Sequence, residues 1–241
     1  KAVPSMPSTR VPMVADAAAL LAALAQTLRP SHLVTCAFGL REGLLYQALE
    51  PGERAKDPLI EGVRFATEAQ QQVHGYGLAL YDWTDGLFAE EAVALRRLRQ
   101  AVCMLHGTGW ASNPDFRALG GEELALHGNW VGVTASDRAA MGMALFIGMG
   151  GKGEPPAILS QLAEAPLLNR ARQWGYAIRL AQRLSGGAPS ILLQTSLHVQ
   201  HPRLDLCVPQ HLAALDDPVL RRRLDAVTAA LDLAQSRVVV T

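Results

Sequence analysis

The sequence predicts a mostly helical protein that carries a small α/β part. Through residues 59–150 apolar side chains recur at spacings of three and four, which is typical of amphipathic helices. After about residue 188 the apolar residues form short β-prone runs, separated by turn residues, around one further helix. A helix–strand pair precedes residue 40. With 241 residues, of which 49% are apolar, the chain can bury a sizeable core.

The composition excludes several classes of protein. The chain has 22 basic and 22 acidic side chains, so no net field would hold a nucleic acid or a membrane surface. Its cysteines, Cys36, Cys103 and Cys207, lie far apart in apolar runs, which favours buried thiols in a reducing compartment such as the cytoplasm. No uninterrupted apolar run approaches the roughly 18 residues that span a bilayer, and no signal peptide is evident. We therefore expect neither a nucleic acid nor a membrane as partner.

The N-terminal segment, residues 1–50, is predicted to hold a helix and a strand, and a second helix is predicted to begin over residues 44–49. Residues 15–27 are rich in Ala and Leu at helical spacing, and Pro30 ends that helix. Residues 33–37 read as a strand, and a turn bounded by Gly39 and Gly43 follows it. One helix and one strand cannot form a sheet alone, and the chain begins with Lys1 instead of Met. We therefore expect a fragment whose missing strands lie upstream or in a partner.

The same turn carries a candidate phosphate site. Arg41 and Glu42 lie where the predicted strand ends, which is the usual place for ligand groups in open α/β sheets. The planar guanidinium of Arg41 can donate two parallel hydrogen bonds to a phosphate. The alternative is a surface ion pair at a strand end, which the local pattern alone favours because short motifs often match by chance.

Residues 50–58 form a polar linker with two prolines, and we place a domain boundary there. The helical domain of residues 51–150 is predicted to contain helices over 59–72, 74–84, 89–106, 120–128 and 135–148. Ser136, with Arg138 after it, is typical of a capped helix start. The helix over 89–106 has a core-facing stripe formed by Ala92, Leu95, Leu98, Val102 and Leu105.

Residues 151–187 are predicted to extend this helical domain, with helices over 157–163 and 167–184. Gly186 and Gly187 end the second of these helices. Residues 188–241 are predicted to form a small α/β domain. It would contain strands over 191–199 and 204–208, a helix that opens at Asp217 and runs to about residue 233, and a short edge strand over 238–240.

Histidines occur on successive predicted helices, at His74, His106 and His127. This arrangement resembles the HD-type phosphohydrolase bundle, in which His and Asp side chains hold metal ions that activate water. The diagnostic His-Asp pair is replaced here by His106-Gly107, so the carboxylate that would anchor a metal is missing. We expect no metal at these histidines, and the simpler interpretation is that they are hydrogen-bonded core or rim groups.

Arginines cluster on three of the predicted helices. Two short clusters are Arg96, Arg97 and Arg99 on the helix over 89–106, and Arg221, Arg222 and Arg223 on the last helix. The helix over 167–184 adds Arg170, Arg172, Arg179 and Arg183. Such clusters are usually solvated helix faces, but they could also line a groove for a long polyanion. The neutral composition argues against nucleic acid as that polyanion and leaves a local polyphosphate channel open.

Three stretches together resemble the C-terminal part of an exopolyphosphatase of the Ppx/GppA family, the guanosine pentaphosphate phosphohydrolase family. The first is Phe38-Gly39-Leu40-Arg41-Glu42-Gly43-Leu44-Leu45-Tyr46. The second is Leu105-His106-Gly107-Thr108-Gly109-Trp110, followed by Asn113-Pro114-Asp115-Phe116-Arg117 and by Leu126-His127-Gly128-Asn129-Trp130-Val131-Gly132. The third is residues 138–151, a helix that ends in Gly-Gly. The resemblance covers nearly the whole chain.

The resemblance implies that residues 1–50 are the end of an actin-like (ribonuclease H-like) domain, that residues 51–150 are an HD-like helical domain and that a small α/β domain ends the chain. The parent enzyme would cleave terminal phosphoanhydrides of inorganic polyphosphate, or the 5′ phosphate of guanosine pentaphosphate, with a divalent metal such as Mg²⁺. Its catalytic residues are expected upstream of Lys1. In this chain Arg41 would face phosphate, with Gly39 and Glu42 beside it, and no metal would be bound.

The family also implies that this part of the protein binds the polymer along a groove and contributes to a homodimer in the cytoplasm. Two other hypotheses remain. The chain could be a non-catalytic helical scaffold or regulatory module without a phosphate role. It could also be a metal-dependent HD nucleotide phosphohydrolase, if His74, His106 or His127 held a metal.

Overall fold

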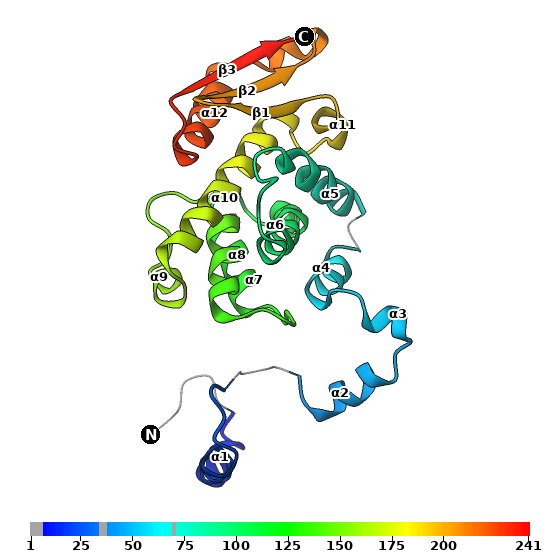
Figure 1. Cartoon of the computed structure of the whole chain (residues 1–241), viewed down its shortest axis with the longest axis vertical. Coiled ribbons are helices and arrows are strands. Elements are labelled where there is room, and N and C mark those ends of the chain that lie inside the picture. Colours follow the sequence, from blue (N-terminus) through cyan, green and yellow to red (C-terminus); the bar gives the residue numbers. More distant parts are fainter. Residues whose placement is uncertain (1–6, 34–37, 69–70) are drawn as a thin grey trace. The chain divides into compact units, whose positions relative to one another are not determined.

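A computed structural model describes residues 7–33, 38–68 and 71–241, without the side chains of residues 71–74 and 111 (Figure 1). Its contacts divide the chain into two units, Lys1–Gln47 and Ala48–Thr241. Within these ranges the chain is mostly helical with a small three-stranded sheet, as the sequence predicts. The actin-like nature of the first unit stays a prediction.

The first unit consists of the short 3-10 helix η1 (Val11–Met13), α1 (Val14–Leu28) and α2 (Leu40–Gln47). The predicted helix over 15–27 is confirmed. Residues 34–37 of the predicted strand lie outside the described residues. The predicted turn over 39–43 is wrong, because a helix begins there. The Gly39 N–H donates to Glu42 Oε2 at 2.8 Å, and the Gly43 N–H donates to the Gly39 carbonyl at 3.1 Å, which closes the first helical turn.

In the described part of this unit no side chain is buried. The apolar residues of α1 are therefore exposed, among them Leu20, Leu24 and Leu28. The stretch Val11–Leu28 has 18 residues, a mean hydropathy of 1.6 and no buried residue, so by length and composition alone it could cross a membrane. The prediction that no stretch approaches this length counted only uninterrupted apolar residues, and by mean hydropathy it is wrong.

The described residues of the second unit contain ten α-helices and two 3-10 helices, and most of the longer ones agree closely with the predicted ranges. The α-helices are α3 (Pro51–Arg54), α4 (Pro58–Glu68), α5 (Gln71–Asp85), α6 (Val93–His106), α7 (Arg117–His127), α8 (Ala135–Gly148), α9 (Ile158–Leu162), α10 (Ala165–Ser185), α11 (Pro189–Leu192) and α12 (Pro218–Ala230). The 3-10 helices are η2 (Gly107–Ala111) and η3 (Gln210–Leu215).

Two predicted helix starts need correction. The helix predicted over 89–106 begins only at Val93, because Ala92 has an extended backbone (φ −59°, ψ 149°). For α8 the capping residue is Thr134 and not Ser136. The Thr134 hydroxyl accepts from the Asp137 N–H at 3.1 Å, and Asp137 Oδ2 accepts from the Thr134 N–H at 2.9 Å. These two reciprocal bonds form a capping box.

The helices pack around α6, which lies in the middle of the bundle and contacts α4, α5, α8 and α10 (Figure 1). The helices α7, α8 and α10 form a neighbouring layer. Close approach of α8 and α10 depends on Gly175, since a Cβ there would lie 2.7 Å from Ile147 Cβ. One apolar cluster extends from Leu59 to Leu233, so residues 51–150, 151–187 and 188–241 share a core.

The sheet has the order β1 (Ser196–Gln200), β2 (Arg203–Val208), β3 (Gln235–Val240). β1 and β2 form an antiparallel hairpin, and β3 lies parallel to β2 after the crossover through α12. The predicted edge strand over 238–240 is confirmed. The strand predicted over 191–199 begins only at Ser196, because residues 189–192 form α11, whose first residue Pro189 already has a helical φ.

On one face of the sheet three charged side chains form a row. Asp205 accepts from Arg203 Nε at 2.6 Å and from Arg237 Nη2 at 3.1 Å across the parallel pair. The hydrogen bonds from Arg203 and then Arg237 hold the pKa of Asp205 below its usual value. On the other face Leu204, Leu206 and Val208 are buried.

Candidate functional site

The predicted phosphate residues lie at the start of α2. Arg41 Nη2 donates to Glu42 Oε1 at 2.7 Å, and Glu42 Oε2 accepts from the Gly39 N–H. The hydrogen bond from Arg41, then that from Gly39, lowers the pKa of Glu42. The Arg41 side chain is 86% exposed. The structure therefore places Gly39, Arg41 and Glu42 at a helix N-terminus, where Arg41 and Glu42 form the surface ion pair that is the alternative interpretation of the sequence.

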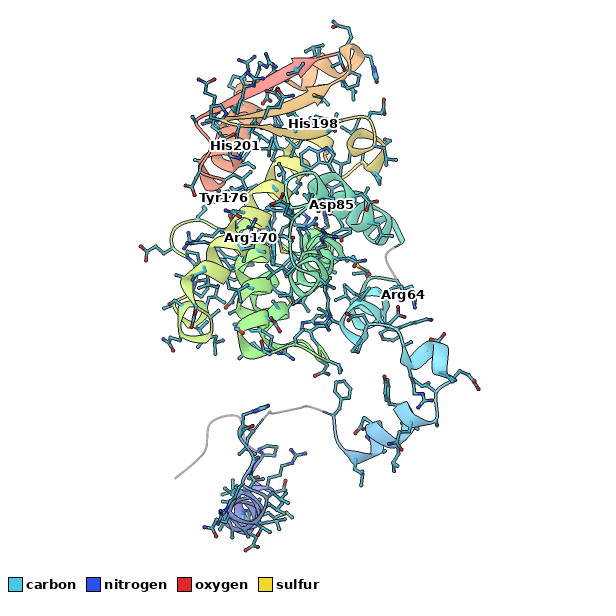
Figure 2. The ribbon with its side chains drawn as sticks, viewed as in Figure 1. Arg64, Asp85, Arg170, Tyr176, His198 and His201 are labelled. Atoms are coloured by element: carbon cyan, nitrogen blue, oxygen red, sulfur yellow. The ribbon has the colours of Figure 1, made fainter. Side chains whose placement is uncertain are left out.

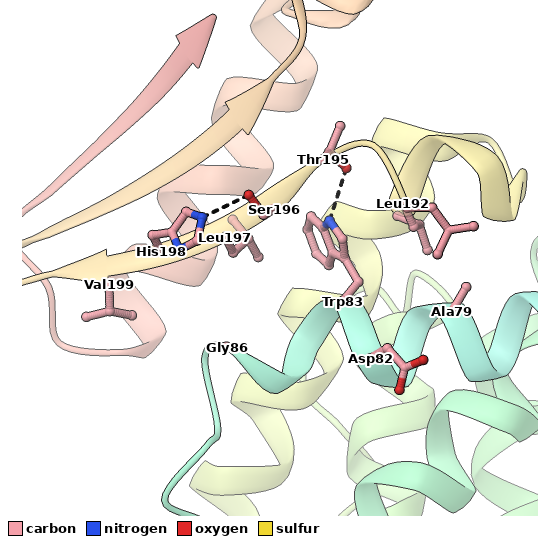
Figure 3. Close-up of a pocket in the computed structure, with 11 residues that line it drawn as sticks. Ala79, Asp82, Trp83, Gly86, Leu192, Thr195, Ser196, Leu197, His198 and Val199 are labelled. Carbon is pink, nitrogen blue, oxygen red and sulfur yellow. Dashed lines mark hydrogen bonds between the residues drawn. The ribbon is translucent and has the colours of Figure 1, made fainter. Parts of the chain in front are cut away.

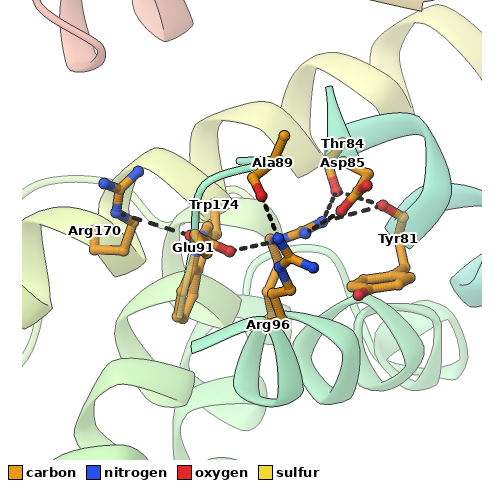
Figure 4. Close-up of polar contacts among 9 residues, drawn as sticks. Tyr81, Thr84, Asp85, Ala89, Glu91, Arg96, Arg170 and Trp174 are labelled. Atoms are coloured by element: carbon orange, nitrogen blue, oxygen red, sulfur yellow. Dashed lines mark hydrogen bonds and ion pairs between the residues drawn. The ribbon is translucent and has the colours of Figure 1, made fainter. Parts of the chain in front are cut away.

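Arg99, predicted to line a polyanion groove, lies in the core of the bundle. Its side chain has no exposed surface. It donates to Glu91 Oε2 at 2.9 Å, to Asp85 Oδ1 at 2.8 Å and to Thr84 Oγ1 at 2.8 Å, and its guanidinium lies 4.5 Å from the centroid of the Tyr81 ring (Figure 4). This corrects the prediction, because its guanidinium is buried and donates hydrogen bonds to groups inside the protein.

The Arg99 network links α5, α6 and α10. Glu91 Oε1 accepts from the Trp174 indole N–H at 2.6 Å and lies 3.8 Å from Arg170 Nε (Figure 4). Burial opposes the charge of Arg99, but its bonds to Asp85 and Glu91 raise the pKa of the guanidinium above its ordinary value. Glu91 and Trp174 were not predicted from the sequence, since they are far apart in the chain and only the fold brings them together.

The other two arginines of α6 also make internal contacts. Arg97 pairs with Asp57 and donates to the Gly132 carbonyl at 2.8 Å, so it fastens the start of α4 to the loop before α8. Arg96 is half-buried and donates to the Ala89 carbonyl, which helps hold the extended segment before α6 (Figure 4). The structure does not bring Arg96, Arg97 and Arg99 together on one open surface.

The two candidate arginines of α10 differ in their surroundings. Arg183 pairs with Asp217, the capping residue of α12. Arg179 is half-buried, and within the described residues no carboxylate pairs with it. Burial, and next the nearby positive charge of Arg223, lower the pKa of Arg179.

The candidate histidines occupy different environments. His106 is buried and its Nε2 lies 3.3 Å from the Gly148 carbonyl oxygen, whereas His127 is exposed at the end of α7. The side chain of His74 is outside the described residues. Within those residues no group of three or more His, Cys, Asp or Glu side chains is placed to hold a metal ion.

A pocket of about 460 Å³ lies between α5, α11 and β1 (Figure 3). On its inner side the Trp83 indole N–H donates to Thr195 Oγ1 at 3.1 Å. His198 Nε2 lies 2.9 Å from Ser196 Oγ on the β1 side of the pocket, and Asp82 comes from α5. None of the predicted site residues lines this pocket.

The fold is thus a helical domain with a small α/β end. Most of the candidate arginines form ion pairs or hydrogen bonds within it. A family model described as the C-terminal domain of exopolyphosphatase matches residues 68–238. The chain therefore belongs to the exopolyphosphatase C-terminal family. It matches none of the curated proteins compared with it.

Proposed function

We propose that this chain is the polymer-binding C-terminal part of an exopolyphosphatase. It would bind inorganic polyphosphate, or guanosine pentaphosphate, while residues upstream of Lys1, with Mg²⁺, would cleave the terminal phosphoanhydride. The observation that carries the proposal is the family match over residues 68–238. The exposed Arg41, oriented by Glu42, supports a phosphate contact at the start of α2.

The proposed division of labour, in which this chain binds the substrate and other residues of the enzyme cleave it, follows from the chemistry of phosphoryl transfer. That reaction depends mainly on positioning the phosphate chain and on neutralising its charge with metal ions and cations. The described residues offer exposed cations such as Arg41 but no cluster of metal ligands. We infer that the chain alone binds the substrate without turning it over.

We propose that the protein is a cytoplasmic homodimer that uses neither a nucleic acid nor a membrane. The exposed apolar residues of α1, such as Leu20 and Leu24, would pack against the actin-like domain from which this segment is expected to come. Sedimentation analysis of the parent protein tests the dimer.

A phosphate-release assay tests the proposed lack of activity. The chain is incubated with long polyphosphate and Mg²⁺, and released phosphate is measured against the parent enzyme. We expect no release above background from the chain. A turnover within the range of ordinary enzymes, about 1–1,000 per second, would refute the division of labour.

One observation favours the scaffold as a second candidate function. Arg97 and Arg99, two of the predicted groove residues, are used in ion pairs within the bundle. A scaffold would show no binding of polyphosphate, whereas a polyanion site would show binding that weakens as salt rises.

A further inference from the structure

The helices α10 and α12 run antiparallel, and two contacts fix their register. Near the end of α10, Arg183 pairs with Asp217, which caps the start of α12. Near the start of α10, Gln173 Nε2 donates to the Ala230 carbonyl at the end of α12 at 2.9 Å. Figure 1 shows the two helices side by side.

This register places Arg179 and Arg223 at the same level. Arg179 lies four residues before Arg183, about 6 Å along α10, and Arg223 lies six residues after Asp217, about 9 Å along α12. Both side chains are half-buried. The two arginines are therefore level with one another on neighbouring helices. After burial, the positive charge of Arg223 is the next cause that lowers the pKa of Arg179.

The neighbouring carboxylates are already engaged. Asp217 pairs with Arg183, Asp216 pairs with Arg221 at 2.7 Å, and Asp225 accepts from the Ser236 hydroxyl at 2.5 Å. In the described structure no carboxylate forms an ion pair with Arg179 or with Arg223. A pair of like charges that is partly removed from water and has no counter-ion is costly unless an anion binds between them.

The loop after α8 borders Arg179. At Gly150, where φ is +95°, an added Cβ would lie 3.8 Å from Arg179 Nη2, so the guanidinium lies beside this loop. Tyr176, labelled in Figure 2, lies one turn before Arg179 on α10. Arg179 thus lies on the part of α10 that borders this loop, level with Arg223 on α12.

We propose that Arg179 and Arg223 form a site for a phosphoryl group of a phosphoanhydride chain. Two guanidinium groups can each donate paired hydrogen bonds to the oxygens of one phosphoryl group, which also neutralises their mutual repulsion. The identity of the anion as a phosphoanhydride rests on the proposed function. The site itself rests on the helix register and on the unpaired charges.

Binding of inorganic phosphate, tripolyphosphate and long polyphosphate to the full chain tests the site by calorimetry. The variants are Arg179→Gln and Arg223→Gln, and the matched control is Arg221→Gln, which removes the same charge from an arginine that is paired with Asp216. We expect each site variant to bind tripolyphosphate about tenfold more weakly, and the control to stay within about twofold of the unsubstituted chain.

Thermal melting in buffer without phosphate or sulfate gives a second measurement. Because each site variant removes a like-charge repulsion, we expect Arg179→Gln and Arg223→Gln to melt at or above the temperature of the unsubstituted chain. Melting well below it would show a structural pair and would overturn the proposed site.

The outcomes separate the site from the proposed function. If long polyphosphate binds the chain but the site variants behave like Arg221→Gln, the site is wrong and polymer binding stands. If tripolyphosphate binds through the two arginines but long polyphosphate does not bind, the site stands and the polymer role fails. If the unsubstituted chain binds none of the three probes, both are wrong.

Discussion

Arg99 has a positive charge with no exposed side-chain surface, and its partners come from α5 and from the segment before α6. Replacing it would leave Glu91 buried with only its bond to Trp174 and a distant contact to Arg170. We expect Arg99→Met to lower the free energy of unfolding by about 3–5 kcal/mol, measured by chemical denaturation.

The control for Arg99 is Arg64→Met. Arg64 pairs with Glu61 at the surface of α4, and its side chain is 43% exposed. Exposed pairs of this kind contribute about 0–1 kcal/mol. Equal losses for the two variants would contradict the structural role of the buried Arg99 network.

The burial of His106 predicts how the stability of the fold depends on pH. Burial lowers the pKa of His106 from 6.5 to about 4, so between these values the unfolded chain takes up a proton that the folded chain does not. The stability from this group is therefore complete above pH 6.5 and is lost as the pH falls toward 4, by roughly 3 kcal/mol. We expect His106→Gln to remove this part of the pH dependence, measured by denaturation at several pH values. An unchanged slope would contradict a buried neutral imidazole.

At the scale of the element, the start of α8 depends on Thr134. We expect Thr134→Ala to lower the unfolding free energy by about 1 kcal/mol, since it removes the oxygen that accepts from the Asp137 N–H. Ser136→Ala is the control, because its hydroxyl only contacts that of Thr134. A larger loss for Ser136→Ala than for Thr134→Ala would show that Ser136, as the sequence predicts, caps α8.

Two helical glycines are expected to respond in opposite directions to alanine. At Gly175 a Cβ would lie 2.7 Å from Ile147 Cβ and 2.9 Å from the Ala144 carbonyl oxygen, so Gly175→Ala should cost about 1–3 kcal/mol by forcing α8 and α10 apart. At Gly120, an exposed position of α7, nothing lies within 4 Å, and Gly120→Ala should gain up to about 1 kcal/mol. Thermal or chemical denaturation of both variants tests the close packing of α8 and α10. A Gly175→Ala variant that is no less stable would contradict it.

Local sequence signals predicted the helices well. Apolar periodicity located α8 and α10 to within about two residues, and Gly186 marked the end of α10 as a glycine with positive φ. Errors occurred where a side chain or the neighbouring backbone determines the local conformation. Glu42 closes a helical turn where glycines suggested a loop, and the extended Ala92 delays α6. No local pattern in the sequence reports such contacts.

At the scale of the whole molecule, the sequence predicted the family but misjudged some charged residues. A cluster such as Arg96, Arg97 and Arg99 looks alike in sequence whether its charges are solvated or paired inside the fold. Only the packing of α5 and α6 shows that Arg99 forms ion pairs with Glu91 and Asp85. In contrast, the register of α10 and α12 leaves Arg179 and Arg223 without carboxylates in the described structure.

We propose that this chain binds long polyphosphate through its cations. The affinity of the chain for long polyphosphate in about 50 mM and about 200 mM salt tests this directly, since electrostatic binding to a polyanion weakens as ions screen the charges. We expect binding at low salt and a loss of about tenfold or more at high salt. No binding at low salt, or an affinity that does not change with salt, would contradict it.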